Sequence, residues 1–298
     1  MPRLAPSIVQ HLPNLSLDHA CVELEQLRQQ GIGLLTWDEA DYPAQLFDLA
    51  SPPLVLFWRG QRLSNLGICS NRYQTKIKTL QDTGFRLQSE PEMGIVAIVG
   101  SRQVSERSRI TARQLAYELS KQGVTIVSGL ALGIDHAAHQ GTLDSRYGQT
   151  VAVLGNGLAT IYPPQNHPLA EQIIEQRGVI LSEQRPESSA EPSHLMRRNR
   201  IIAALCQAII VIEADRNSGA LEAVRQAQKL GRRLYAYPGS LGTDWMLAHT
   251  TAQPLVWDAP QADMLVAQIQ QPLRQPALIQ PRLLERGSIF VLDRDKDS

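Results

Sequence analysis

A run of four polar residues, three of them arginine, is the strongest candidate for chemistry in this chain. The run comprises Arg197, Arg198, Asn199 and Arg200 and directly precedes the apolar segment 201–205, so it falls at the expected start of a helix. Guanidinium groups there oppose the positive end of the helix dipole, and local conflicts of this kind are typical of functional sites. Because a guanidinium is a planar fork of donors that matches phosphate oxygens, the run indicates a phosphate-binding site. A solvated basic helix face is the plainer alternative.

Small residues follow most of the short, β-prone runs of the sequence. These strand-end residues are Gly100, Ser101 and Arg102; Ser128 and Gly129; Gly155, Asn156 and Gly157; Ser182 and Glu183; Glu213 and Ala214; and Pro238 and Gly239. In an open parallel sheet, ligands bind beyond the carboxyl ends of the strands. Small residues let a ligand approach the backbone, and the start of each following helix favours an anion. The pattern predicts an anion-binding edge; tight strand-to-helix turns that merely require glycine are the alternative.

Two further groups of titratable residues invite a chemical interpretation. His136 and His139 are three residues apart but have no third ligand nearby, so we expect no metal site there. We expect Asp135 to accept backbone N–H bonds at a helix start and His139 to be satisfied by a neighbour. Glu183 and Glu213 each follow a strand, where they either form an acid–base pair or neutralise the nearby arginines, and we favour the second interpretation.

Seven short apolar runs must position these residues. They are 95–99, 124–127, 150–154, 179–181, 208–212, 233–237 and 254–257. Helical segments lie between them, and continuous apolar strands alternating with helices are typical of a parallel sheet covered on both faces. The sequence therefore predicts an α/β fold: a doubly wound, Rossmann-like parallel sheet with a small N-terminal appendage and a short C-terminal tail.

We predict four regions along the chain. They are a small N-terminal helical or mixed segment (1–62), a connection (63–94), a Rossmann-like domain (95–258), and a tail that is partly disordered or docks elsewhere (259–298). Within the first region, spacing predicts a helix over 17–30, and the run 53–58 is β-prone.

Composition limits the class of protein. The 298 residues carry 29 basic and 29 acidic side chains, which excludes a polybasic coat, so any anion binding must be local. Cys21, Cys69 and Cys206 are too scattered for a disulfide framework. No apolar stretch approaches the roughly 18 residues of a membrane span, and the start does not resemble a secretory signal. These features predict a soluble, cytoplasmic protein with no membrane association.

Several common motifs are missing. The sequence contains no GxxxxGK[ST] and so no ordinary phosphate-binding loop of that class. The segment GNGLAT has Thr160 in place of the third glycine of a dinucleotide fingerprint, and Arg177 stands where its ribose-binding acid is expected. No serine lies in a nucleophile elbow. Hydride transfer and serine hydrolysis are therefore poorly supported.

Eight segments in order resemble the DNA-processing protein A family, also called Smf. They are AIVGSR (97–102), SGLALGIDHAAH (128–139), TVAVLGNGLATIYPPQN (150–166), GVILSE (178–183), RRNRIIAAL (197–205), IVIEA (210–214), SGAL (218–221) and YAYPG (235–239). The resemblance implies a protein that binds single-stranded DNA, protects incoming DNA and helps to load the RecA recombinase in natural transformation and recombination. It also implies a homodimer that needs no cofactor and is not an enzyme.

By motif, Arg102 resembles the family's phosphate-contacting arginine, and the run 197–200 resembles the basic stretch beside the same pocket. The predicted DNA-binding residues are Gly100, Ser101, Arg102, Ser128, Gly129, Gly155, Asn156, Gly157, Arg197, Arg198, Asn199, Arg200, Ser218 and Gly219. We predict no catalytic and no metal-binding residue. Three positions depart from the family: Leu195 and Met196 replace an aromatic residue and a proline, and Glu222 replaces a threonine.

Two other functions remain open at this stage. One is a Rossmann-like protein that binds or hydrolyses small nucleotides, with Glu183 or Glu213 as the base; PGSLGTDW (238–245) is only an echo of the motif of such enzymes. The other is a degenerate family member kept as an interaction protein, which the departures at Leu195 and Glu222 would explain.

Overall fold

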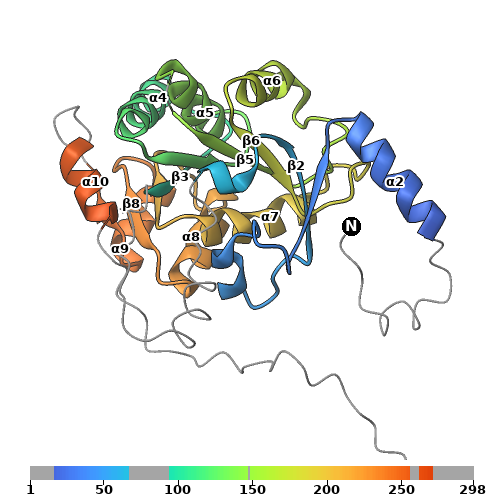
Figure 1. Cartoon of the computed structure of the whole chain (residues 1–298). Helices are drawn as coiled ribbons and strands as arrows, with labels where there is room; N and C mark the ends of the chain where they lie inside the picture. The colour runs from blue at the N-terminus through green and yellow to red at the C-terminus, as the bar shows by residue number, and fades with distance from the viewer. Residues whose placement is uncertain (1–16, 67–93, 147, 256–261, 271–298) are drawn as a thin grey trace, which may run out of the picture.

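One nine-stranded sheet organises the described part of the computed structural model, residues 17–66, 94–146, 148–255 and 262–270 (Figure 1). Its strands are β1 (Gly33–Thr36), β2 (Val55–Gly60), β3 (Ile95–Val99), β4 (Thr125–Ser128), β5 (Thr150–Leu154), β6 (Val179–Ser182), β7 (Ala208–Val211), β8 (Arg233–Ala236) and β9 (Gln253–Pro254), in the spatial order β1-β2-β6-β5-β4-β3-β7-β8-β9. Strands β3 to β9 are parallel, and β2 is antiparallel to both β1 and β6.

The direction of strand addition reverses once, between β3 and β7. From β3 the chain adds β4, β5 and β6 on one side, then returns to place β7 against the other side of β3, where Ile98 pairs with Ile210. All five residues of β3 and all four of β7 are buried, as continuous apolar strands covered on both faces should be. The predicted doubly wound, Rossmann-like fold is confirmed, and ligands in such sheets bind where the strand order reverses.

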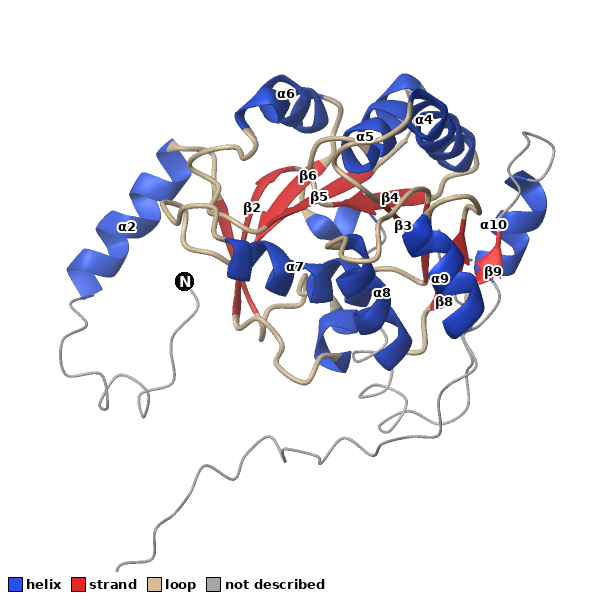
Figure 2. Ribbon diagram, turned by 180° about the vertical axis from the view of Figure 1, so that it is seen from behind, coloured by secondary structure: helices blue, strands red, loops and turns tan. Residues whose placement is uncertain are grey.

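Helices cover both faces of this sheet (Figures 1 and 2). The helices are α2 (Leu17–Gln29), α4 (Glu106–Lys121), α5 (Ile134–Asp144), α6 (His167–Glu175), α7 (Pro192–Leu205), α8 (Ala220–Lys229), α9 (Leu241–His249) and α10 (Ala262–Gln270), with 3₁₀ turns η1 (Ala44–Asp48), η2 (Leu63–Leu66) and η3 (Pro164–Asn166). Helices α4, α5 and α6 lie on one face, and α7 and α8 lie on the other.

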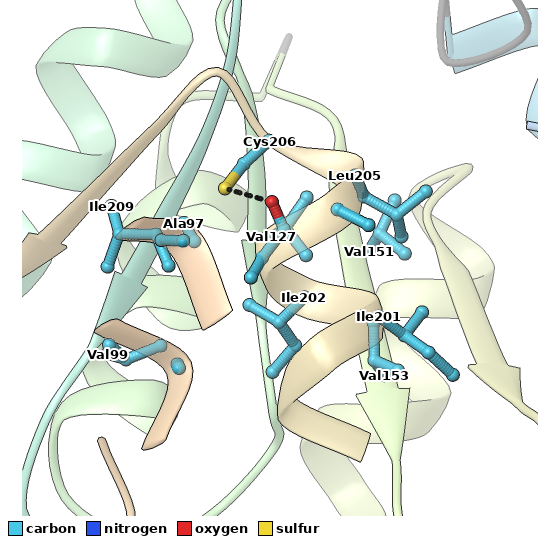
Figure 3. Close-up of a cluster of buried hydrophobic side chains, with 14 of the residues drawn as sticks. Ala97, Val99, Val127, Val151, Val153, Ile201, Ile202, Leu205, Cys206 and Ile209 are labelled. Carbon is cyan, nitrogen blue, oxygen red and sulfur yellow. Dashed lines mark hydrogen bonds between the residues drawn. The ribbon is translucent and has the colours of Figure 1, made fainter. Parts of the chain in front are cut away.

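Helix α7 packs its apolar side against the middle of the sheet (Figure 3). Ile201 and Ile202 lie against valines of β4 and β5, among them Val127 and Val153, in one buried cluster. Cys206 closes this cluster, and burial raises the pKa of its thiol to about 12, so the thiol stays protonated. This packing fixes the position of α7, which carries the arginine run.

The N-terminal segment contributes two strands to the same sheet. The β-prone run at 53–58 forms β2, and Gly33–Thr36 pairs with it as β1, a strand that the sequence did not predict. The Tyr42 hydroxyl donates to the Pro53 carbonyl (2.5 Å). The segment is tied to α7 because Arg232 donates from the same Nη2 to Asp48 (3.0 Å) and to the Ala204 carbonyl (3.0 Å). Strands β1 and β2 therefore extend the sheet of the Rossmann-like domain.

The structure describes only part of the expected connection (63–94) and of the expected tail (259–298). Most of the expected connection, residue Cys69 and most of the expected tail lie outside the described residues, so the domain boundaries stay a prediction. Helix α10 is described, and its Leu265 and Val266 pack against the core beside α4. Cys21 is exposed. None of the helices described here is long and apolar enough to cross a membrane.

Candidate functional site

Helix α7 carries the arginine run away from its first turn. The helix begins at Pro192, after an N-cap at Glu191, so Arg197 lies in the second turn. The sequence placed the helix start at Arg197, which is wrong by five residues. Because the helix dipole acts mainly within the first turn, the expected conflict between three guanidinium groups and the dipole is weak.

Arg198 is a buried structural residue. Its side chain extends from α7 to the sheet, where Nη1 donates to the carbonyl of Gly129 (2.6 Å) and to that of Val153. These carbonyls stand at the ends of β4 and β5, so one guanidinium joins α7 to two neighbouring strands. Only 7% of the residue is exposed. The structure thus gives Arg198 a different role from the phosphate contact expected of it.

Asp135 balances the buried charge of Arg198. Its carboxylate accepts from the N–H groups of Gly129 (3.1 Å) and Ala131 (3.4 Å) at the start of α5. Gly129 therefore bridges the pair, since its carbonyl accepts from Arg198. Burial raises the pKa of Asp135 and lowers the pKa of Arg198, and each group's charge opposes the shift of the other. The expectation that Asp135 accepts backbone N–H bonds is confirmed.

The strand-end glycines make room for the protein's own atoms. A Cβ at Gly129 would overlap the Arg198 guanidinium, and one at Gly155 would lie 2.7 Å from Leu195 Cα. A Cβ at Gly157 would strike the Arg185 carbonyl, and at Gly100 it would press on the Ile134 side chain. These four glycines therefore serve close internal packing, the alternative weighed from the sequence.

Gly219 differs from the other glycines. A Cβ there would meet only Met196 Sδ, at 3.7 Å, which is ordinary contact, and the residue is exposed. Its φ of −57° suits any residue. Of the glycines predicted to bind DNA, it is the one that lies open on the surface of the described structure.

Alanine substitutions should separate these two kinds of glycine. We expect Gly129→Ala to lower the free energy of unfolding by about 1–3 kcal/mol, because the added methyl displaces the Arg198 guanidinium. Gly219→Ala should change it by less than about 0.5 kcal/mol. Urea unfolding followed by circular dichroism measures both, and equal losses in the two variants would contradict this assignment.

Arg200 and Arg197 share one acid, Glu183. Arg200 Nη2 lies 2.6 Å from each carboxylate oxygen, and the Arg200 side chain is only 12% exposed. Arg197 also contacts Glu183 (3.1 Å) but leaves 56% of its side chain exposed. The favoured interpretation of Glu183, as a partner for arginines, is confirmed. Arg200 is thereby neutralised, whereas Arg197 keeps a free surface.

Glu213 is held at the start of α4. Its carboxylate accepts from Ser105 Oγ (2.8 Å) and from Ser105 N (3.2 Å), at the N-cap of that helix. Burial raises the pKa of Glu213, but hydrogen bonds from Ser108 and Ser105 outweigh it and hold the pKa below its usual range. Glu213 pairs with a helix cap and not with an arginine, contrary to the sequence expectation.

Within the described structure, Arg102 is an unpaired guanidinium at the point where the strand order reverses. It is exposed, and within the described ranges it has no ion pair or hydrogen bond of its own. The preceding residue, Ser101, is fixed by an N–H bond to the Glu213 carbonyl (2.7 Å), which joins the ends of β3 and β7. The charge of Arg102 reaches Arg198, whose pKa it helps to lower.

The remaining predicted residues divide by burial. Ser128 and Asn156 are buried and bonded to backbone carbonyls, the first to Ile98 (2.6 Å). Asn199 is buried as well and donates to the Gly219 carbonyl (3.0 Å), which joins α7 to the loop after β7. We define the switch-point edge as five predicted residues that keep accessible surface at the strand ends, in the loop after β7 and on α7. They are Ser101, Arg102, Arg197, Ser218 and Gly219.

Met196 also lies at this edge and was not predicted as a site residue. It is 42% exposed beside Gly219, whereas Leu195 is half-buried against Gly155. By the family resemblance, Met196 occupies the position of a proline and Leu195 the position of an aromatic residue, so an exposed thioether replaces the expected proline. Nothing in the sequence distinguished the two residues.

His139 is a buried neutral histidine. Its Nδ1 lies 2.7 Å from the Thr150 hydroxyl, which itself donates to the Ile126 carbonyl (2.8 Å), so Nδ1 carries the proton. Nε2 has no hydrogen-bond partner among the described residues. Burial, aided by the charges of His136 and Arg198, lowers the pKa of His139 to about 3. The expectation that a neighbour satisfies His139 is confirmed for one of its two nitrogens.

The protein should lose stability in mild acid because of His139. The unfolded histidine takes up a proton near pH 6.5 and the folded one only near 3, so its contribution is complete above about 6.5 and falls below it. We expect about 2 kcal/mol less stability at pH 5 than at pH 7. His139→Leu should flatten this pH dependence in urea unfolding, and an unchanged slope in that variant would count against the assignment.

The fold and the edge together define a class. A doubly wound parallel sheet with exposed guanidinium groups where the strand order reverses is a Rossmann-like fold that carries positive charge at the place where such folds bind ligands. The sequence model of the family described as DNA recombination-mediator protein A matches residues 68–254. The chain therefore belongs to that family.

Individual relatives agree. The Smf protein of Synechocystis is 39% identical over 217 residues, which cover 73% of this chain and 48% of that protein. The structure of DNA processing protein A from Helicobacter pylori, described for its single-stranded DNA binding mode, has a TM-score of 0.64 and 28% identity, covering 80% of this chain and 96% of that one. The Streptococcus pneumoniae structure also has a TM-score of 0.64 and 28% identity, covering 84% and 80%.

This chain spans about half to two thirds of the length of three curated relatives that it matches. We therefore treat the activity of those longer proteins as a proposal for this chain.

Proposed function

We propose that this chain binds single-stranded DNA along the switch-point edge, as a recombination accessory protein. One observation carries the proposal: Arg102 is exposed and unpaired within the described structure, at the position where doubly wound sheets bind ligands. Arg197 supplies a second exposed guanidinium from α7. Gly219, in the loop after β7, leaves the backbone accessible.

Fluorescence anisotropy with labelled single- and double-stranded oligonucleotides tests the proposal. Two phosphate contacts on a single strand predict a slope of roughly −1.4 in log K against log salt. We expect tighter binding of the single strand at every salt concentration. Binding that does not depend on salt, or no binding at micromolar oligonucleotide, would refute the proposal.

Two contacts support a binding role over a catalytic one. Glu213 is engaged in capping α4, and Glu183 is held by two arginines, so neither carboxylate is poised as a general base. We therefore expect nucleoside monophosphates to remain intact after incubation with the protein, with chromatography of released base as the measurement.

The partners implied by the family resemblance stay predictions. We infer that the protein works in the cytoplasm during natural transformation, forms a homodimer and helps to load the RecA recombinase. Light scattering coupled to size-exclusion chromatography measures the oligomeric state. A strand-exchange assay with RecA, in which the DNA is first coated by single-strand binding protein, measures loading.

A further inference from the structure

A small cavity shares the loop after β7 with the switch-point edge, and its lining residues belong to none of the predicted sites. It is lined by Arg216, Leu221, Arg225 and Trp245, and its volume is about 90 Å³. We name it the Trp245 cavity. Its walls come from the loop after β7, from α8 and from α9, which lie side by side in Figures 1 and 2.

The loop after β7 connects this cavity to the proposed DNA-binding edge. The loop starts at Glu213, whose carbonyl accepts from Ser101 N (2.7 Å), and reaches Arg216 three residues later. The next residue after Glu213 anchors α9, because the Ala214 carbonyl accepts from Gly242 N (2.6 Å) and Ala214 N donates to Ser240 Oγ (3.1 Å). The loop after β7 therefore contacts the residue before Arg102 at its start and lines the Trp245 cavity at Arg216.

The lining of the cavity suits one nucleotide. Trp245 is half-buried and held in place by stacking on His249, with ring centroids 5.3 Å apart and planes at 14°. Arg216 is exposed and makes no ion pair or side-chain hydrogen bond in the described ranges, whereas Arg225 pairs with Glu222 (3.2 Å). An indole beside a free guanidinium matches a base and its phosphate.

The size of the cavity argues against a free cofactor. Pockets that enclose a whole small molecule measure roughly 300–1,000 Å³. A cavity of about 90 Å³ is too small for that and instead fits part of a longer molecule that lies across it.

We propose that the Trp245 cavity is a second nucleotide subsite for the same single strand, in which a base packs against Trp245 and Arg216 binds the adjoining phosphate. The proposal rests on the proposed function, because the switch-point edge places the strand. It predicts that binding energy grows with strand length until the strand spans both sites.

Oligothymidylates of two lengths, about 5 and about 20 nucleotides, test this subsite in the full chain. We expect Arg216→Gln and Trp245→Leu each to weaken binding of the longer strand about tenfold and to leave the shorter strand unaffected. Arg216→Gln should also reduce the magnitude of the salt slope of the longer strand by about 0.7. Matched controls are Arg146→Gln, an exposed arginine in the turn between α5 and β5, and Trp37→Leu, which follows β1 and is 45% exposed.

A spectroscopic measurement guards against misfolding of the Trp245→Leu variant. Binding of the longer strand should quench the tryptophan emission of the wild type, and the milder Trp245→Phe variant should lose that quenching. If both lengths bind and neither Arg216 nor Trp245 affects the longer strand, the subsite is refuted while the proposed function stands. If neither length binds the wild type, the proposed function fails first.

Discussion

Replacing Arg198 with methionine is expected to lower the free energy of unfolding by about 3–5 kcal/mol. The guanidinium donates to carbonyls at the ends of β4 and β5 and faces the buried carboxylate of Asp135 across Gly129. Methionine fills similar space but leaves Asp135 without its countercharge and two carbonyls without a donor. Loss of one partner from a buried charge pair is among the costliest single substitutions.

The neighbouring residue provides the matched control. Arg197→Met removes the same charge one position earlier on α7, where the side chain is 56% exposed and only shares Glu183. An exposed ion pair of this kind is worth at most about 1 kcal/mol. Urea unfolding of the two variants gives the comparison, and similar losses in both would show that Arg198 is not the structural member of the run.

A second large effect is expected at Arg102. We expect Arg102→Gln to weaken single-stranded DNA binding by about tenfold or more, because a charge-assisted bond to phosphate contributes roughly 1.5–3 kcal/mol. Stability should hardly change, since the side chain makes no ion pair or hydrogen bond in the described structure. Anisotropy with oligonucleotides of several sequences measures the effect, which should be the same for each sequence because phosphate contacts carry no sequence information.

Substitutions of Arg102 and Arg198 should thus separate an effect on DNA binding from an effect on stability, a distinction that the sequence did not reveal. Both are arginines in family motifs, and both were predicted to contact phosphate. Loss of DNA binding by the Arg198 variant would be a consequence of unfolding, so it has meaning only beside a stability measurement. Loss of binding by a stably folded Arg102 variant reports on the edge itself.

The central strands could be predicted from the sequence because their residues are apolar on both faces. The run at 150–154 matches β5 residue for residue, since Gly155 ends it and both neighbouring layers require apolar side chains. Strand β1 was missed because Gly33–Thr36 is short and acquires its structure by pairing with β2. Its position depends on contacts distant in sequence, which a local pattern does not contain.

The candidate site was predictable by residue type but not by orientation. Consecutive helix residues point about 100° apart, so Arg198 points away from Arg197 and Arg200, which are three residues apart and share Glu183. Which of them is buried depends on where the ends of β4 and β5 meet α7, a fact of tertiary packing. The glycine pattern was read as room for a ligand, yet at Gly129 the room is taken by Arg198 itself.

The salt dependence of binding tests the central claim most directly, that the exposed guanidinium groups of the switch-point edge are the phosphate contacts. Anisotropy titrations over a salt series with a short oligothymidylate would compare the wild type with an Arg102→Gln, Arg197→Gln double variant and an Arg146→Gln control. We predict that the double variant loses about 1.4 from the magnitude of the slope of log K against log salt, whereas the control keeps the wild-type slope. A stably folded double variant with the wild-type slope would contradict the claim.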